Sequence, residues 1–133
     1  MWTPDPAKII TAEQKAATAK QSLCDAINAD RTRRIVAGKV IDGIHVTGRD
    51  EDARNLTNLA LAAQLRISTG DTSTVTLFRD GDNVDHELAP LQVMSLWQQS
   101  SEYVSALYAA SWALKALDPI PADFADDSYW PAT

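Results

Sequence analysis

One long heptad-like stripe near the carboxyl end constrains this chain more than any other feature. From Pro90 onward, apolar or small residues recur alternately four and three positions apart over about 28 residues, as in a helix that packs along another helix. Such a helix is about 42 Å long at 1.5 Å per residue. The spacing fits a homo-oligomer built on this helix and equally a monomer that buries the stripe internally. The members of the stripe are Val93, Trp97, Ser100, Val104, Leu107, Ser111 and Leu114.

A second long helix is predicted over residues 11–37. Thr11 and Gln14 have the spacing of a capping box, and Gly38 is suited to end the helix in the left-handed conformation. Its apolar stripe is narrow and rich in alanine, so we expect the helix to lie against another helix or a second subunit. The basic run at 31–34 is interpreted as the solvated end of this helix.

Two hairpins and a shorter helix are predicted between the long helices. Residues 39–47 surround Asp42-Gly43, which favours a tight type I′ turn. A helix over 50–69 follows, then a hairpin over 74–88 with a polar turn. Pro90 is suited to the first position of the last helix, predicted over 90–117. The pattern predicts an α+β fold.

The chain is expected to form one domain over 11–117 with an arm at each end. The arms, 1–10 and 118–133, contain prolines and large aromatic residues. Aromatic residues in such arms either anchor a partner or fold back onto their own domain. Trp97 and Trp112, on the last helix, are expected in the core. The candidate interface residues are Trp2, Pro4, Phe124, Tyr129 and Trp130 on the arms, with Val104 and Leu107 on the helix.

The charge balance argues against two classes of partner. Eighteen acidic and twelve basic residues give a net charge of -6, which repels nucleic acid and anionic lipid. We therefore expect no nucleic-acid or membrane partner. The sequence shows no secretion signal, and its single cysteine, Cys24, excludes an intrachain disulfide, so synthesis and folding in a cytoplasm are expected.

The residues that could bind a metal or take part in catalysis are not spaced as those functions require. A calcium loop beginning at Asp80 needs glycine and glutamate where the chain has Asp85 and Leu91. His45 and His86 have no second ligand at metal-binding spacing and are expected on exposed strand faces. With no nucleophile motif or glycine-rich loop, we expect no catalytic, metal or cofactor site and no enzymatic activity.

Five segments of the chain resemble the DUF4376 domain family. The most specific are an Arg-Asp-x-Asp-Asn-x-x-His strand turn and a Ser-Trp-x-Leu-Lys helix, within 78–88 and 108–116. The others are 27–31 leading to Gly38, 40–46 and 52–56. The resemblance implies a small protein associated with the tail or tail fibre of a bacteriophage.

In that setting we expect a structural component of the tail tip, baseplate or tail-fibre attachment, located in the virion tail. Its expected partners are other tail, fibre or baseplate proteins, and tail symmetry favours a homo-oligomer, plausibly a trimer. The alternative is a tail-fibre assembly chaperone that is absent from the finished particle. A third class, a carbohydrate-cleaving enzyme, requires paired carboxylates in a cleft, whereas the acids here fall mostly in first helical turns and loops.

Overall fold

The computed structural model describes residues 11–133, and the predicted N-terminal arm lies outside the described residues. Three helices and two hairpins follow one another in the predicted order, which confirms the α+β class. The bounds are α1 Ala12–Ala37, β1 Lys39–Ile41, β2 Ile44–Val46, α2 Asp50–Ser68, β3 Thr76–Arg79, β4 Asp85–Leu88, α3 Pro90–Lys115 and a short 3₁₀ turn, η2, Asp127–Tyr129.

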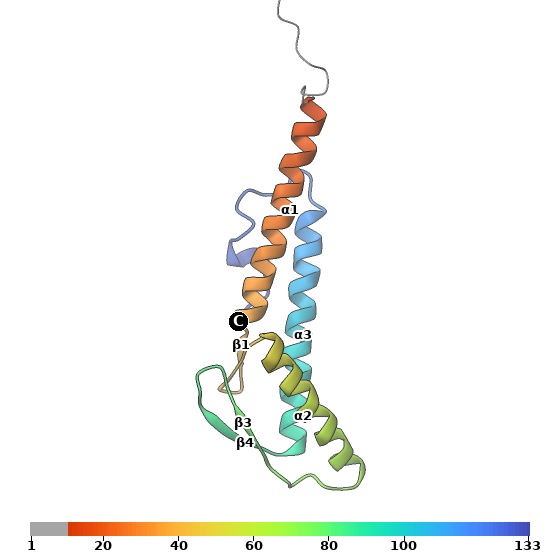
Figure 1. The fold of residues 1–133 in the computed structure, drawn as a ribbon, viewed down its shortest axis with the longest axis vertical. Helices are drawn as coiled ribbons and strands as arrows, with labels where there is room; N and C mark the ends of the chain where they lie inside the picture. Colours follow the sequence, from red (N-terminus) through yellow and green to blue (C-terminus); the bar gives the residue numbers. More distant parts are fainter. Residues whose placement is uncertain (1–10) are drawn as a thin grey trace, which may run out of the picture.

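The helix α3 is the spine of an elongated molecule (Figure 1). α1 runs antiparallel beside its C-terminal half, and α2 packs against its N-terminal half. The two hairpins lie around the N-terminal half as two separate two-stranded antiparallel sheets. The N-terminal turns of α1 continue beyond the end of α3.

Local chemistry begins and ends α1 where the sequence predicts. The Gln14 N–H donates to the Thr11 hydroxyl at 3.1 Å, and the Thr11 N–H donates to the Gln14 side chain at 2.9 Å. Gly38 follows the helix with φ +72, and its N–H donates to the Arg34 carbonyl at 3.0 Å. A Cβ on Gly38 would lie 1.9 Å from the Val46 carbonyl oxygen. Glycine is therefore required both for the backbone conformation and for the close approach of β2.

Both hairpins form, and their turns follow the predicted chemistry. Asp42 and Gly43 have φ values of +51 and +79, the two positive angles of a type I′ turn. In the second hairpin β3 begins at Thr76, two positions after the predicted start, and Phe78 pairs with His86.

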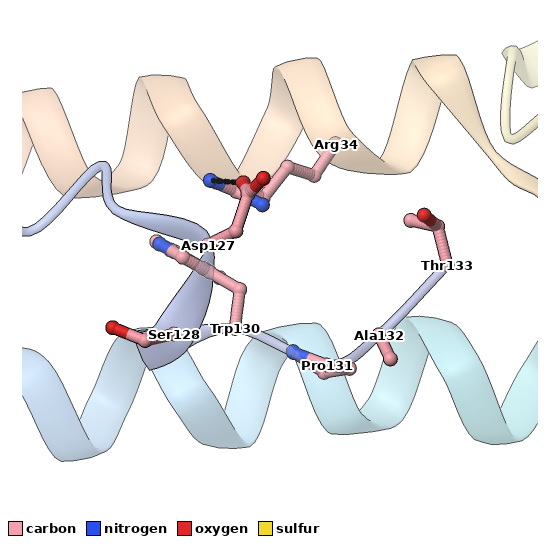
Figure 2. A pocket seen from close by; sticks show the side chains of 7 residues that line it. All are labelled: Arg34, Asp127, Ser128, Trp130, Pro131, Ala132 and Thr133. Carbon is pink, nitrogen blue, oxygen red and sulfur yellow. Dashed lines mark ion pairs between the residues drawn. The ribbon is translucent and has the colours of Figure 1, made fainter.

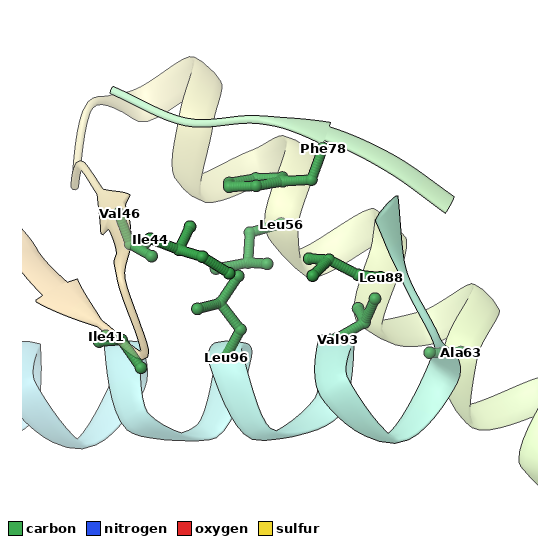
Figure 3. Packing of buried hydrophobic residues seen from close by; sticks show 9 residues of the cluster. All are labelled: Ile41, Ile44, Val46, Leu56, Ala63, Phe78, Leu88, Val93 and Leu96. Atoms are coloured by element: carbon green, nitrogen blue, oxygen red, sulfur yellow. The ribbon is translucent and has the colours of Figure 1, made fainter. Parts of the chain in front are cut away.

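The N-terminal half of α3 contributes to a core shared with α2 and both hairpins. Figure 3 shows Phe78 and Leu88 pointing from the second hairpin toward Leu56 on α2 and Val93 on α3. The buried members of this first core are Ile41, Ile44, Val46, Leu56, Ala63, Phe78, Leu88, Val93 and Leu96.

The C-terminal half of α3 contributes to a second core, shared with α1. Ile27 and Leu107 are completely buried in it. Its other buried members are Tyr103, Leu114, Ile120 and Trp130. One helix therefore belongs to two cores, one near each end.

The predicted stripe on α3 is only partly the buried one. Val93, Leu107, Ser111 and Leu114 are buried as expected. Two other predicted members, Trp97 and Val104, are only half-buried. In each case the residue just before it in the sequence, Leu96 or Tyr103, is the buried one. Trp112 was also expected in the core, but it is 60% exposed, so that prediction is wrong.

The prediction of an extended C-terminal arm over 118–133 is also wrong. After α3 the chain folds back along the second core, where Ile120 and Trp130 are 8% and 6% exposed and Phe124 packs against them. Burial of these apolar side chains favours the packed segment over a solvated one. The segment is an integral part of the fold.

Leu107→Ala tests whether α3 buries its stripe internally. Removing a completely buried leucine should lower the free energy of unfolding by about 2–5 kcal/mol. Val104→Ala, at a half-buried residue one turn earlier on α3, is the matched control. It should lower the free energy of unfolding by about 1 kcal/mol or less. Urea denaturation measures both values, and equal losses would contradict internal burial of Leu107.

Candidate functional site

A shallow apolar groove follows the seam between α2 and α3. Leu61 on α2 borders it and is 63% exposed. Leu65, 67% exposed, lies one turn further along α2, in an adjoining hollow lined by α2 residues alone. Trp97 on α3 lines two adjoining hollows, and Val104 lines the larger of these, about 320 Å³ in volume. We call this surface the α2–α3 groove. Its principal lining residues are Thr57, Leu61, Gln64, Met94, Trp97, Ser100, Ser101 and Val104.

The groove exists because α2 carries more leucine than its own core uses. Leu56, Ala60 and Ala63 form the buried face of α2. Leu61 and Leu65 are four positions apart and so lie one above the other on a different side of the helix. Large exposed apolar side chains that adjoin a hollow are typical of surfaces that bind other proteins. The groove is therefore the candidate functional site.

A second exposed feature lies higher on α3, facing α1. The rings of Tyr108 and Trp112 contact each other with centroids 5.9 Å apart. The Arg31 guanidinium stacks over Tyr108 at 4.3 Å, and its Nη1 donates to the Ser111 hydroxyl at 2.9 Å. The buried Arg31 Nε has no hydrogen-bond partner among residues 11–133. This arginine is held by α3 rather than by a carboxylate.

The Asp and His residues of the second hairpin hold the two hairpins together. The buried Asp80 carboxylate accepts hydrogen bonds from His86 Nε2 at 2.8 Å and from the backbone N–H groups of Asp82 and Val84. The Gly81 N–H donates to the His45 carbonyl on β2 at 2.8 Å. This turn therefore docks directly on the first hairpin, and we call the contact the hairpin junction.

His45 completes the hairpin junction by spanning two elements. Its Nε2 lies 2.7 Å from the Ala37 carbonyl oxygen, and its Nδ1 lies 3.1 Å from an Asp82 carboxylate oxygen. Both partners are acceptors, so only the imidazolium donates to both at once. The Ala37 carbonyl, followed by the Asp82 carboxylate, raises the pKa of His45 above its ordinary value of 6.5.

The hydrogen bond from His86 is the main cause that lowers the pKa of Asp80 to about 2. Both histidines are half-buried and bonded, so the prediction that they lie on exposed strand faces is wrong. Residues 11–133 contain no group of three or more His, Cys, Asp or Glu side chains that is arranged to hold a metal ion.

A third hollow, about 520 Å³ in volume, lies between the C-terminal segment and α1 (Figure 2). Arg34 projects from α1 into it and pairs with Asp30 at 2.9 Å and with Asp127 at 3.0 Å. The same guanidinium donates to the Ala125 carbonyl and lies 4.9 Å from the ring centroid of Trp130. These contacts clamp the C-terminal segment, so the arginine run is not simply the solvated end of a helix as predicted.

The predicted interface residues differ in where they lie and in how exposed they are. Leu107 and Trp130 are buried in the second core and Phe124 packs against it, so none of the three serves as an exposed anchor. Tyr129 is 37% exposed, and its hydroxyl donates to Asp123 at 3.0 Å. Val104 lines the α2–α3 groove. Trp2 and Pro4 lie outside the described residues.

Leu61 and Leu65 were not predicted to be surface residues. A helical wheel of α2 gives the only sequence sign of them, because both fall outside the stripe formed by Leu56, Ala60 and Ala63. Tyr108 and Trp112 were not predicted to be surface residues either. A wheel of α3 gives a sign of them, because each directly follows a residue of the predicted stripe, Leu107 or Ser111, and is therefore rotated by about 100° from it.

The hairpin junction predicts a pH dependence of stability. Because the pKa of His45 is raised in the folded protein, its contribution is fully present below about pH 6.5 and is lost as the pH rises through the folded value. Urea denaturation between about pH 5 and 8 should show wild-type stability falling with pH. His45→Gln should remove most of this slope, and an unchanged slope would show that the junction does not bind the proton.

Trp130→Ala tests the clamp on the C-terminal segment. Loss of this buried ring should cost about 3 kcal/mol and free the segment for chymotrypsin cleavage after Phe124. Tyr129→Ala alters the preceding, exposed ring and is the matched control, with little effect on stability or cleavage. Similar cleavage rates in the two variants would contradict the clamp.

Comparison with known proteins gives a family. Residues 18–128 match the model of the family described as a domain of unknown function (DUF4376). Neither the curated proteins nor the solved structures include a match to the chain. Within residues 11–133, no helix has both the length and the apolar character needed to cross a membrane. Because the family match covers most of the sequence, the chain belongs to the DUF4376 family.

Proposed function

We propose that this protein is a non-enzymatic structural component of the tail of a tailed bacteriophage, at the tail tip, baseplate or tail-fibre attachment. The proposal starts from the DUF4376 membership and from the resemblance of its segments to tail-associated domains. In this role the protein works by contact with other tail, fibre or baseplate proteins and resides in the virion tail.

The observation that carries the proposal is the α2–α3 groove. Leu61 leaves more than half of its surface in solvent beside the half-buried Trp97, and Leu65 is equally exposed one turn further along α2. Burying such side chains against a partner gains about 25 cal/mol per Å² of apolar area. An aromatic side chain such as Trp97 with apolar side chains beside it is typical of the centre of a protein–protein interface. The groove therefore suits a protein ligand with an apolar ridge.

The polar residues support a structural role in a second way. Asp80, His86 and His45 are the side chains in the described part of the chain that most resemble catalytic groups. All three are engaged in the hairpin junction, where each hydrogen bond joins one element to the next. Their arrangement supplies rigidity to the end of the molecule that bears the α2–α3 groove.

The tail-fibre assembly chaperone is the competing role. An exposed apolar groove on a protein with a net charge of -6 also suits a soluble escort for fibre subunits. A structural component stays in the finished particle, whereas an escort leaves it. The composition of purified particles therefore separates the two roles.

Quantitative mass spectrometry of density-gradient-purified particles should detect the protein at a fixed ratio to the major tail-tube protein. Leu61→Asp combined with Leu65→Asp should reduce its incorporation at least tenfold, because a charged groove cannot bury against a partner. Leu77→Asp, on an equally exposed residue of β3, is the control and should be incorporated normally.

Absence of the wild-type protein from particles, with abundance in the lysate, would overturn the structural role in favour of the chaperone. Normal incorporation of the double variant would instead reject the groove as the docking surface. Circular dichroism of the purified variants establishes that each one folds.

A further inference from the structure

α3 carries a second helical stripe beside its buried one. The positions Met94, Trp97, Ser101, Val104 and Tyr108 are spaced alternately by three and four, and Trp112 and Lys115 lie further along the same side. α2 covers the first part of this stripe, where Met94 and Trp97 pack against the first core. Further along, α2 only borders the stripe: Ser101 and Val104 line a hollow with Ala53 and Thr57 at the beginning of α2, and Tyr108 and Trp112 lie beyond it. We call Ser101, Val104, Tyr108 and Trp112 the open stripe.

The open stripe has the features of a helix-packing face. Trp112 and Tyr108 are 60% and 37% exposed, while Ser101 and Ser105 are small and exposed. Small side chains between large ones allow a neighbouring helix to approach closely. Between Ser101 and Trp112, α1 covers only one side of α3. The open stripe on the other side could therefore pack against a third helix.

The same molecule has a stretch of helix with little packing among the described residues. Its nearest neighbour is the turn after α3, where Ala16 and Ala19 share an open hollow of about 540 Å³ with Leu117 and Ile120. Every residue from Ala12 to Ser22 is exposed, and these turns of α1 extend beyond the end of α3 (Figure 1). About three isolated turns of helix are only marginally stable in water. Ala12, Ala16 and Ala19 form a row of small side chains along this free end of α1.

We propose that two copies of this chain associate about a two-fold axis, with the free end of α1 in each copy packed along the open stripe of α3 in the other. A two-fold axis perpendicular to the helices reverses the second copy. α1 of one copy then runs parallel to α3 of its partner, and the helix ends overlap to form a four-helix bundle.

Shape and charge both favour this occupant. The alanine row on α1 leaves space for the rings of Tyr108 and Trp112 to insert. Arg31 and Lys115, on either side of these rings, have no carboxylate partner among residues 11–133. Asp25 follows the alanine row, and its observed hydrogen bond is with the neutral Gln21 amide. The acid of one copy thus complements the bases of the other.

Two-fold symmetry doubles the area that the α1–α3 contact buries between the two copies. A two-fold interface uses each patch twice, so the α1–α3 contact forms at two places in one event. A stable interface buries roughly 1,200–2,000 Å² in total. One short helical contact falls below that range, whereas two contacts and the junction between them approach it. The association does not depend on the phage-tail role, and it covers Ser101 and Val104 at one end of the α2–α3 groove.

Sedimentation equilibrium of the full chain over a wide concentration range tests the association. The wild type should be a dimer at micromolar concentration, and Trp112→Glu or Ala16→Glu should each raise the dissociation constant at least tenfold. Leu91→Glu, at a residue 59% exposed elsewhere on α3, is the control and should leave it unchanged. A wild-type monomer at all concentrations, or a trimer, would overturn the proposal.

Cross-linking tests the arrangement of the helices. In a Cys24→Ala background, Ala16→Cys chains mixed with Val104→Cys chains should link through a short bifunctional thiol reagent. Neither single-cysteine chain alone should link to itself. Efficient linking of Val104→Cys chains alone would show α3 against α3 and would overturn the reciprocal α1–α3 packing.

Discussion

Burial along one side of α3 is the constraint on which the rest of the structure depends. Leu107 and Ile27 are completely buried where α1 crosses this helix, and Val93 is equally buried where α2 and the hairpins meet it. Neither hairpin has a core of its own, since a two-stranded sheet is marginal unless another element covers it. The common packing partner is therefore α3 and not a shared sheet. The elements that pack on it are α1, α2, both hairpins and the C-terminal segment.

Elements that are specified by local chemistry could be predicted from the sequence. The capping box at Thr11 and Gln14 satisfies two backbone N–H groups, and Asp42-Gly43 adopts the positive φ angles of its turn. Pro90 starts α3 without an N–H that would be left unpaired there. Such interactions do not depend on the remainder of the fold. They therefore gave the number, type and order of the elements.

The exposed surface was much less predictable. On α3, Leu96 is adjacent to Trp97 and Tyr103 to Val104, so periodicity alone cannot decide which member of each pair is buried. That choice depends on the side from which α1 and α2 approach. The sequence could not separate a folded-back C-terminal segment from an extended arm for a related reason: Arg34 bonds to Ala125, 91 positions away, and no local pattern specifies such a contact.

Because one helix belongs to two separate cores, the two ends of the molecule need not open together. Cooperative units in proteins open with their own free energies, and here α3 contributes backbone amides to both. Hydrogen exchange along this single helix thus reports two opening reactions.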